Sequence, residues 1–151
     1  GRRVVFLIDR SSSMKGKRFQ LAKEHLIAFI GDLDSGVEFS VIFYNNIHEV
    51  APFEGLQRRS DTLVSEISEW IDSQSARGGT NILTPVVNAL EMEPDTIFLL
   101  SDGEFEERVP SDIDRMNVEG VKINTISLHV ASDSLEKIAA ESGGEYRFVS
   151  P

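Results

Sequence analysis

The chain has 151 residues, 40% of them apolar, and its 25 acidic and 15 basic residues give a formal net charge of −10. Such a length suits one domain of about 100–200 residues with a real core. The acidic surface excludes a nucleic-acid binder, and it disfavours an anionic membrane surface. Because the chain has no cysteine, disulfides, zinc–thiolate sites and cysteine nucleophiles are excluded.

The sequence begins Gly1-Arg2-Arg3 and enters an apolar segment at once, with no initiator methionine or signal peptide. We therefore expect residues 1–151 to form a single domain taken from a longer protein. We also expect the isolated domain to be a monomer. It should not itself insert into a membrane, because no apolar run approaches the roughly 18 residues that span a bilayer. A fragment without cysteine or signal peptide is more typical of a bacterial than of an animal protein, and the bacterial cell envelope or surface is one location that we consider for the parent protein. The compartment itself does not follow from these residues.

The unbroken apolar run at residues 4–8 predicts a first strand buried on both faces. Apolar residues then recur at helical spacing over residues 19–30, which predicts a helix with Gly31 as its C-cap. Residues 37–44 predict a second strand.

The pair Asn45-Asn46 tolerates positive φ and predicts a tight hairpin into a short strand at residues 47–50. A second helix is expected around residues 63–71, whose apolar side chains are spaced for one face. Thr84 and Pro85 predict the start of a third helix, with the threonine as N-cap.

Residues 96–100 predict the third buried strand. Ser111 is expected to cap a short helix that Gly120 ends, and residues 121–128 predict the next strand. A helix should follow from Asp133 to the Gly143-Gly144 pair, before a last strand at residues 146–149.

This alternation of strands and helices predicts an α/β fold. Parallel strands need helical crossovers, and the crossovers are right-handed. We therefore expect a doubly wound, open and mostly parallel β-sheet with helices on both faces and one short antiparallel edge strand.

Polar residues follow the predicted strands where ligands bind in such sheets, beyond the carboxyl ends. Asp9, Ser11 and Ser13 alternate after the first strand, so their side chains are expected to point to one side while the intervening residues point elsewhere. Thr80 follows two glycines, and Asp102 follows the third buried strand. Carboxylates and hydroxyls suit Mg²⁺, and also Mn²⁺ or Ca²⁺, better than zinc or copper.

These three segments together resemble the von Willebrand factor type A (vWA) domain, a relative of the integrin I domain, over essentially the whole chain. They are Asp9-x-Ser11-x-Ser13, Gly78-Gly79-Thr80 and Ser101-Asp102-Gly103. In that family they form the metal-ion-dependent adhesion site (MIDAS). One such segment alone is weak evidence, but three segments in order, each at a predicted strand or helix end, are specific.

The resemblance implies a role for each of the five residues. Ser11 and Ser13 would be direct metal ligands through their hydroxyls, and Thr80 would bind directly or through water. Asp9 and Asp102 would act mainly through water molecules. An ion held mostly by neutral hydroxyls keeps much of its charge, so an acidic side chain of a protein partner would complete its coordination.

The sequence departs from the family pattern at Arg10 and Ser12. Arg10 adds a cation near a cation site, which would either weaken the ion or recruit an acidic ligand. Ser12 stands where glycine is common and reduces the freedom of the loop. Three acidic residues, Glu104, Glu106 and Glu107, follow the last motif and are more consistent with a solvated face than with a functional rim.

The leading hypothesis is a non-catalytic, divalent-metal-dependent protein-interaction module. The first alternative is a metal-assisted phosphohydrolase, since an aspartate after the first strand can serve phosphoryl transfer. Against it, a serine occupies position 11, where a second aspartate would be expected, and no phosphate-binding loop or nucleophile elbow is present. The second alternative is a scaffold domain whose site serves assembly within its own parent protein.

Overall fold

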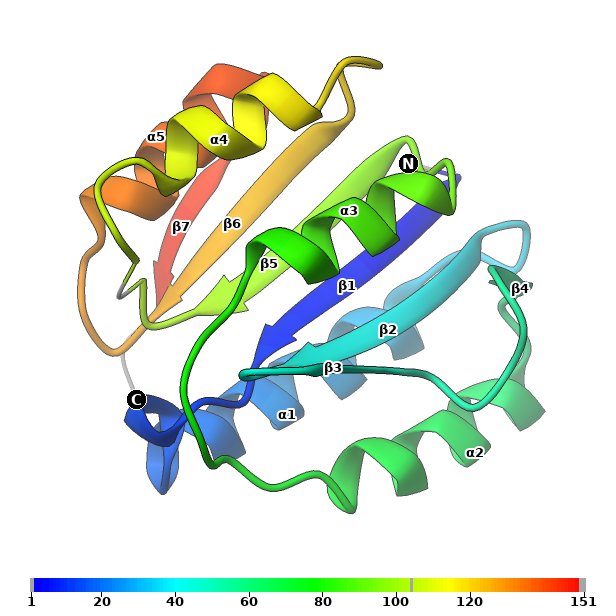
Figure 1. Ribbon diagram of the computed structural model, residues 1–151. Helices are drawn as coiled ribbons and strands as arrows, with labels where there is room; N and C mark the ends of the chain where they lie inside the picture. Colours follow the sequence, from blue (N-terminus) through cyan, green and yellow to red (C-terminus); the bar gives the residue numbers. More distant parts are fainter. Residues whose placement is uncertain (1, 104, 150–151) are drawn as a thin grey trace.

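The computed structural model describes residues 2–103 and 105–149. This part of the chain forms a seven-stranded sheet in the order β3-β2-β1-β5-β6-β7, with β4 paired to β2 (Figure 1). The strands are β1 (Arg3–Asp9), β2 (Glu38–Tyr44), β3 (His48–Val50), β4 (Gln57–Arg58), β5 (Thr96–Ser101), β6 (Lys122–Leu128) and β7 (Tyr146–Val149).

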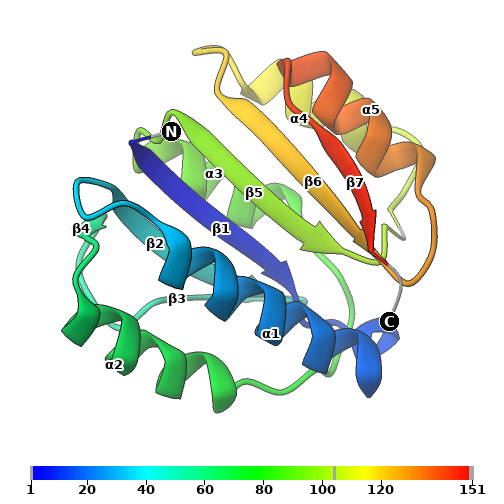
Figure 2. The same ribbon diagram turned by 180° about the vertical axis from the view of Figure 1, so that it is seen from behind.

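Helices cover both faces of this sheet, as Figure 2 shows from the side of α1. Helices α1 and α2 lie on one face of the sheet, and α3, α4 and α5 lie on the other face (Figures 1 and 2). The helices are α1 (Lys17–Asp32), α2 (Asp61–Asp72), α3 (Leu83–Glu91), α4 (Val109–Met116) and α5 (Asp133–Ser142), and a short 3₁₀ turn, η1, spans Ser12–Met14. No helix in the described ranges is long and apolar enough to cross a bilayer.

The predicted fold class is confirmed. β1 pairs in parallel with β2 and β5, and β5, β6 and β7 continue the parallel sheet. The hairpin strand β3 pairs antiparallel with β2. The two-residue strand β4 also pairs antiparallel with β2 and was not predicted, because two residues are too few to show an alternating pattern.

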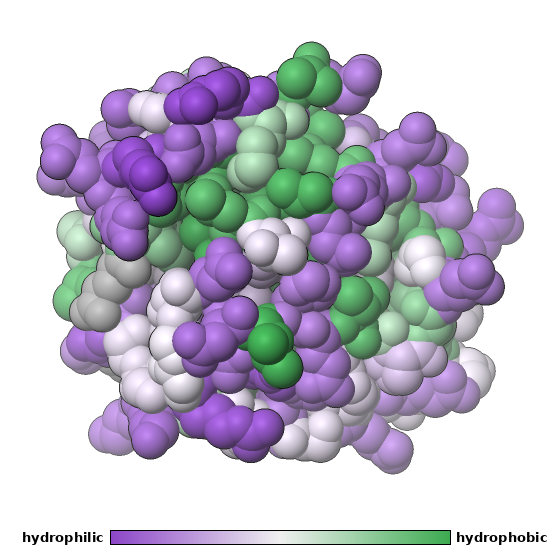
Figure 3. All heavy atoms as spheres, viewed as in Figure 1, coloured by the Kyte–Doolittle hydropathy of each residue, from purple (hydrophilic) through white to green (hydrophobic). Residues whose placement is uncertain are grey.

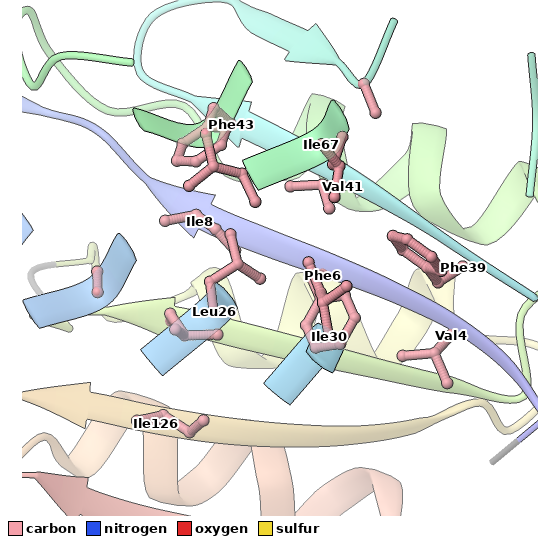
Figure 4. Close-up of a cluster of buried hydrophobic side chains, with 14 of the residues drawn as sticks. Val4, Phe6, Ile8, Leu26, Ile30, Phe39, Val41, Phe43, Ile67 and Ile126 are labelled. Atoms are coloured by element: carbon pink, nitrogen blue, oxygen red, sulfur yellow. The ribbon is translucent and has the colours of Figure 1, made fainter. Parts of the chain in front are cut away.

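The apolar run of β1 is buried from both sides. Val4, Phe6 and Ile8 pack with side chains of α1, α2 and β2 (Figure 4), whereas Val5 and Leu7 pack in a second cluster beneath α3, α4 and α5. Burial of a strand on both faces explains why its sequence is continuously apolar rather than alternating.

Tertiary contacts decide several element ends differently from the local sequence signals. Gly31 lies inside α1, which ends at Asp32 with Leu33 as its C-cap. The Gly31 carbonyl, one of the last in the helix, accepts from Arg59 Nη2 at 2.8 Å. The turn after β2 is not the predicted two-residue turn with positive φ. Asn45 Oδ1 accepts from the Ile47 N–H at 3.1 Å, so a three-residue loop precedes β3.

Two helix starts also differ from prediction. The N-cap of α3 is Ile82 and not Thr84, and Pro85 is tolerated in the first turn because N–H groups there have no helical partner. In the same way α4 begins at Val109, with Pro110 in its first turn, and Ser111 lies within it. The last helix follows the prediction, since Asp133 opens α5 and Gly143 ends it with a left-handed φ of 77°.

The strand order reverses between β1 and β5. From β1 the chain crosses to β2 on one side, and it later returns to β5 on the other side. In open α/β sheets, the crevice at this switch point, beyond the carboxyl ends of the strands, is where ligands bind. Residues 9–13 and 101–103 therefore come together at the position that the fold favours for a site.

Candidate metal site at the sheet switch point

Asp9 ends β1 and lies at the base of the candidate site, with a side chain that is almost completely buried. The Ser11 backbone N–H donates to its Oδ1 at 2.8 Å. The hydroxyl of Ser101, the last residue of β5, donates to its Oδ2 at 2.8 Å. These two bonds join the ends of the two central strands and fix the orientation of the carboxylate.

The hydroxyls of Ser11 and Ser13 lie side by side, with 3.0 Å between the two Oγ atoms. Ser11 is buried and precedes the 3₁₀ turn, and Ser13 lies within it. The tight turn brings residues two positions apart onto one side, as the sequence pattern predicted.

Asp102 follows β5 directly and is buried. Arg18, in the first turn of α1, places Nη1 3.4 Å from Asp102 Oδ2 and 3.3 Å from the Ser13 carbonyl oxygen. This arginine therefore connects the two motif segments, and the sequence analysis did not single it out. The only sequence signal for it was its position in the first helical turn after the serine loop.

Gly103 fixes the path of the chain after Asp102. Its φ is +78°, and a Cβ at this position would overlap the Oγ and Cβ of Ser132. Ser132 is the N-cap of α5, where its Oγ accepts from the Leu135 N–H at 3.1 Å. The loop that carries Asp102 is thus packed against the beginning of the last helix.

The glycine loop that precedes Thr80 lies beside the serine loop. The Ser12 N–H donates to the Gly78 carbonyl at 2.9 Å, and the Arg77 N–H donates to the Arg10 carbonyl at 2.7 Å. Gly78 has a φ of +78°, and a Cβ there would come within 2.7 Å of the Asn46 side chain. Both features require glycine at this position.

Thr80 itself is exposed. Within the described ranges, no hydrogen bond joins its hydroxyl to Asp9, Ser11, Ser13 or Asp102. It lines a cavity of about 270 Å³ together with residues 105, 106, 108 and 109. The structure therefore brings four of the five predicted residues together and places the fifth on an adjoining loop.

Arg10 does not act on the site. Its guanidinium points away, where Nη1 contacts Glu49 Oε2 at 3.0 Å and Gln74 Oε1 at 2.7 Å. The positive charge of Arg10 is paired within the domain. We therefore expect it neither to weaken a bound ion nor to recruit an acidic ligand. Ser12 is exposed and lies in the 3₁₀ turn without a positive φ, so the loop does not require glycine there.

Burial dominates the electrostatics of the site. It raises the pKa of Asp9 above its ordinary value, against the hydrogen bonds from Ser11 and Ser101, and the charge of Asp102 adds to the rise. Burial also raises the pKa of Tyr44 well above its ordinary value, with Asp9 as the next cause. The Tyr44 hydroxyl has no hydrogen-bond partner within the described part of the chain. The neighbourhood of Asp9 therefore favours an added positive charge.

The donors present are hydroxyls and carboxylates, which are hard oxygen ligands suited to Mg²⁺, Mn²⁺ or Ca²⁺. In the described ranges no group of three or more His, Cys, Asp or Glu side chains lies close enough to hold a metal. A site here has to use the serine hydroxyls beside Asp9 and Asp102. Of the acidic residues that follow, Glu106 and Glu107 are exposed, and Glu104 lies outside the described residues.

Comparisons with known proteins agree with this arrangement. The chain is 33% identical over 110 residues to a von Willebrand factor A domain-containing protein of Dictyostelium discoideum, covering 69% of this chain and 12% of that protein. The chain thus spans about an eighth of the length of this curated relative.

Two solved structures share the fold. The von Willebrand factor type A protein from Catenulispora acidiphila superimposes with a TM-score of 0.85 at 23% identity, over 99% of this chain and 39% of that one. The proximal thread matrix protein 1 of the mussel byssus, solved with a zinc-occupied MIDAS motif, gives a TM-score of 0.76 at 24% identity, over 98% of this chain and 41% of that one.

The model of the von Willebrand factor type A domain family matches residues 4–151, which is nearly the whole chain. The match agrees with the sheet order and with the switch point between β1 and β5. The chain belongs to the von Willebrand factor type A domain family.

Proposed function

We propose that this domain is a non-catalytic protein-interaction module that binds an acidic side chain of its partner through a divalent metal ion. Domains of this family are typically interaction or adhesion modules, and they often bind a divalent metal at the MIDAS. In our proposal Ser11, Ser13 and Thr80 hold the ion through their hydroxyls. Asp9 and Asp102 orient the serines and the bound water molecules.

The observation that carries this proposal is the 3.0 Å separation of the Ser11 and Ser13 hydroxyl oxygens. Neighbouring ligands of an octahedral Mg²⁺, each about 2.0–2.1 Å from the ion, lie about 2.8–3.0 Å apart. The hydroxyl pair therefore has the spacing that two such ligands need. Thr80 would join them as a third hydroxyl ligand, although its exposed side chain makes no hydrogen bond with the pair in the described structure.

The charges around the pair support a carboxylate partner. Asp9, Asp102 and the Arg18 guanidinium together leave one net negative charge, and a divalent ion would turn this into one net positive charge. A bound ion supplies an electrophilic position to which an incoming carboxylate coordinates. The residues of the domain hold that position beside the two carboxyl groups.

The hydrolase alternative fits the geometry less well. Both oxygens of Asp9 accept hydrogen bonds, and the side chain is 1% exposed. A nucleophile needs an oxygen that reaches the substrate, whereas this carboxylate is fixed as a support for the serine loop. The bacterial envelope origin expected from the sequence stays a prediction.

Isothermal titration of Mg²⁺, Mn²⁺, Ca²⁺ and Zn²⁺ into the EDTA-treated domain tests the metal site. We expect saturable one-site binding that Ser13→Ala weakens by about tenfold or more, since one direct ligand is lost. Ser12→Ala is the matched control, because this neighbouring serine is exposed and its hydroxyl has no hydrogen bond in the described structure. Equal effects of the two variants would refute the assignment of the serines.

A second titration tests the partner chemistry. A peptide containing aspartate should bind only the metal-loaded domain, and the same peptide with asparagine should not bind. Binding of the aspartate peptide that persists in EDTA and in Asp102→Ala would contradict the proposed mechanism.

A further inference from the structure

A groove at the opposite edge of the sheet from the metal site has no role in the function proposed above. It lies between the C-terminal ends of α3 and α4, near the segments that lead into β5 and β6, and its volume is about 610 Å³. In Figure 3 hydrophobic side chains gather between α3 and α4, with hydrophilic residues on both sides. The apolar residues that line it are Val87, Leu90, Pro94, Met116, Val118 and Val121.

Val118 is the most exposed large apolar side chain in the described ranges, at 83% of its surface. The turn that presents it is held firmly by its neighbours. Asn117 Nδ2 donates to the Val121 carbonyl at 2.7 Å, and Asn117 Oδ1 accepts from the Val121 N–H at 2.8 Å. These two hydrogen bonds close the turn that carries the exposed valine.

Three glutamates, Glu91, Glu93 and Glu119, also line the groove. All three are exposed, and none of them takes part in an ion pair within residues 2–103 and 105–149. Arg3 donates to the Met92 and Glu93 carbonyls at the end of α3, each at 2.9 Å, and Arg115 lies in the last turn of α4. These two arginines pair with Glu38 and Asp112 rather than with the three glutamates. The rim of this apolar groove is therefore complementary to positive charge.

Two of these glutamates occupy positions that are locally unfavourable. Glu91 is the last residue of α3, where a negative charge opposes the helix dipole, and the only compensation in the described ranges is Arg3, which donates to the Met92 carbonyl at 2.9 Å. Glu93 has a φ of +56°, a left-handed conformation that glycine or asparagine adopts more readily. Local rules broken together at one surface are expected where that surface serves a function.

We infer that this groove docks an amphipathic segment of a partner protein, whose apolar side chains cover Val118 and its neighbours while flanking Lys or Arg side chains meet the three glutamates. An apolar floor with an acidic rim fits such a segment better than a purely apolar or an acidic one. The groove needs no metal, so it is a second interaction surface, separate from the metal site.

The test uses a synthetic amphipathic peptide of leucine and lysine, with a matched peptide in which glutamate replaces each lysine. Amide chemical shifts of the domain should change around the groove on titration with the lysine peptide only, and EDTA should have no effect. Val118→Ser should weaken binding by about tenfold, as expected for the loss of one buried aliphatic side chain. Ile47→Ser is the control, because Ile47 is 67% exposed on the hairpin after β2.

Glu93→Gly separates docking from folding. We expect it to weaken peptide binding about threefold and to raise the unfolding midpoint, because glycine relieves the left-handed conformation. Glu66→Gln, which removes an exposed charge from α2, should change neither. Binding that maps elsewhere, or that tolerates Val118→Ser, would overturn the inference. Absence of saturable binding would also overturn it. Concentration-dependent self-association through the same residues would overturn it as well, because it would identify a second copy of the chain as the occupant.

Discussion

Replacement of Gly103 by alanine tests how tightly the Asp102 loop is packed against α5. A Cβ at Gly103 would overlap the side chain of Ser132 and approach Leu135 Cδ1 to 3.4 Å. Gly143 is the matched control, because its φ of +77° is nearly the same as the +78° of Gly103 and nothing lies within 4 Å of its Cβ position. Both alanines meet the same backbone strain, but only the first meets a steric obstacle.

The expected magnitudes follow from these two terms. A non-glycine residue in the left-handed region costs about 1–2 kcal/mol, and forcing extra volume into a packed position costs about 1–3 kcal/mol more. We therefore expect Gly143→Ala to lower the free energy of unfolding by about 1–2 kcal/mol, and Gly103→Ala by about 2–5 kcal/mol. The gain from reduced unfolded-state entropy is common to both variants and cancels in the comparison.

Urea denaturation of the two variants and the parent domain measures the difference. The double variant Gly103→Ala with Ser132→Gly removes the obstacle and retains the backbone strain, while replacement of an N-cap serine by glycine costs only a few tenths of a kcal/mol. In that background the alanine should cost about as much as at Gly143. Equal destabilisation by the two single variants, or no relief in the double variant, would refute the packing of this loop against α5.

Three further substitutions test other contacts. Arg10→Ala should lower the free energy of unfolding by about 1.5–3 kcal/mol, because the buried guanidinium loses its charge-assisted hydrogen bonds. Metal affinity measured by calorimetry should stay unchanged. A large change in this affinity would contradict the pairing of Arg10 away from the site. Arg18→Gln should raise metal affinity about two- to tenfold, because it removes a cation 3.4 Å from Asp102. Lys17→Gln is the control, and it should change metal affinity less. Partial burial raises the pKa of Asp95, but hydrogen bonds from two backbone N–H groups and a threonine hydroxyl outweigh it, and the pKa is lowered. The stability that the ionised Asp95 contributes is therefore lost as the pH falls below about 4. In thermal melts over this pH range, the unfolding midpoint of Asp95→Asn should fall less than that of the parent domain. Equal falls of the two midpoints would contradict the assignment.

The architecture and most of the candidate site could be predicted from local patterns of residues. Strands buried on both faces require continuous apolar runs, and these runs at residues 4–8 and 96–100 marked the centre of the sheet. The spacing of Asp9, Ser11 and Ser13 reflects the geometry of a few consecutive residues, so it could be read locally. The family resemblance extended this reading to Thr80 and Asp102.

Contacts between groups that are distant in the sequence could not be predicted in this way and follow from the packing of the folded chain. Arg59 donates to the Gly31 carbonyl in the last turn of α1, and the Arg10 guanidinium points away from the site because it binds Glu49 and Gln74. The contact of Arg18 with Asp102 joins residues 84 positions apart. No local pattern encodes such contacts, because they depend on how helices and loops pack after the sheet has formed.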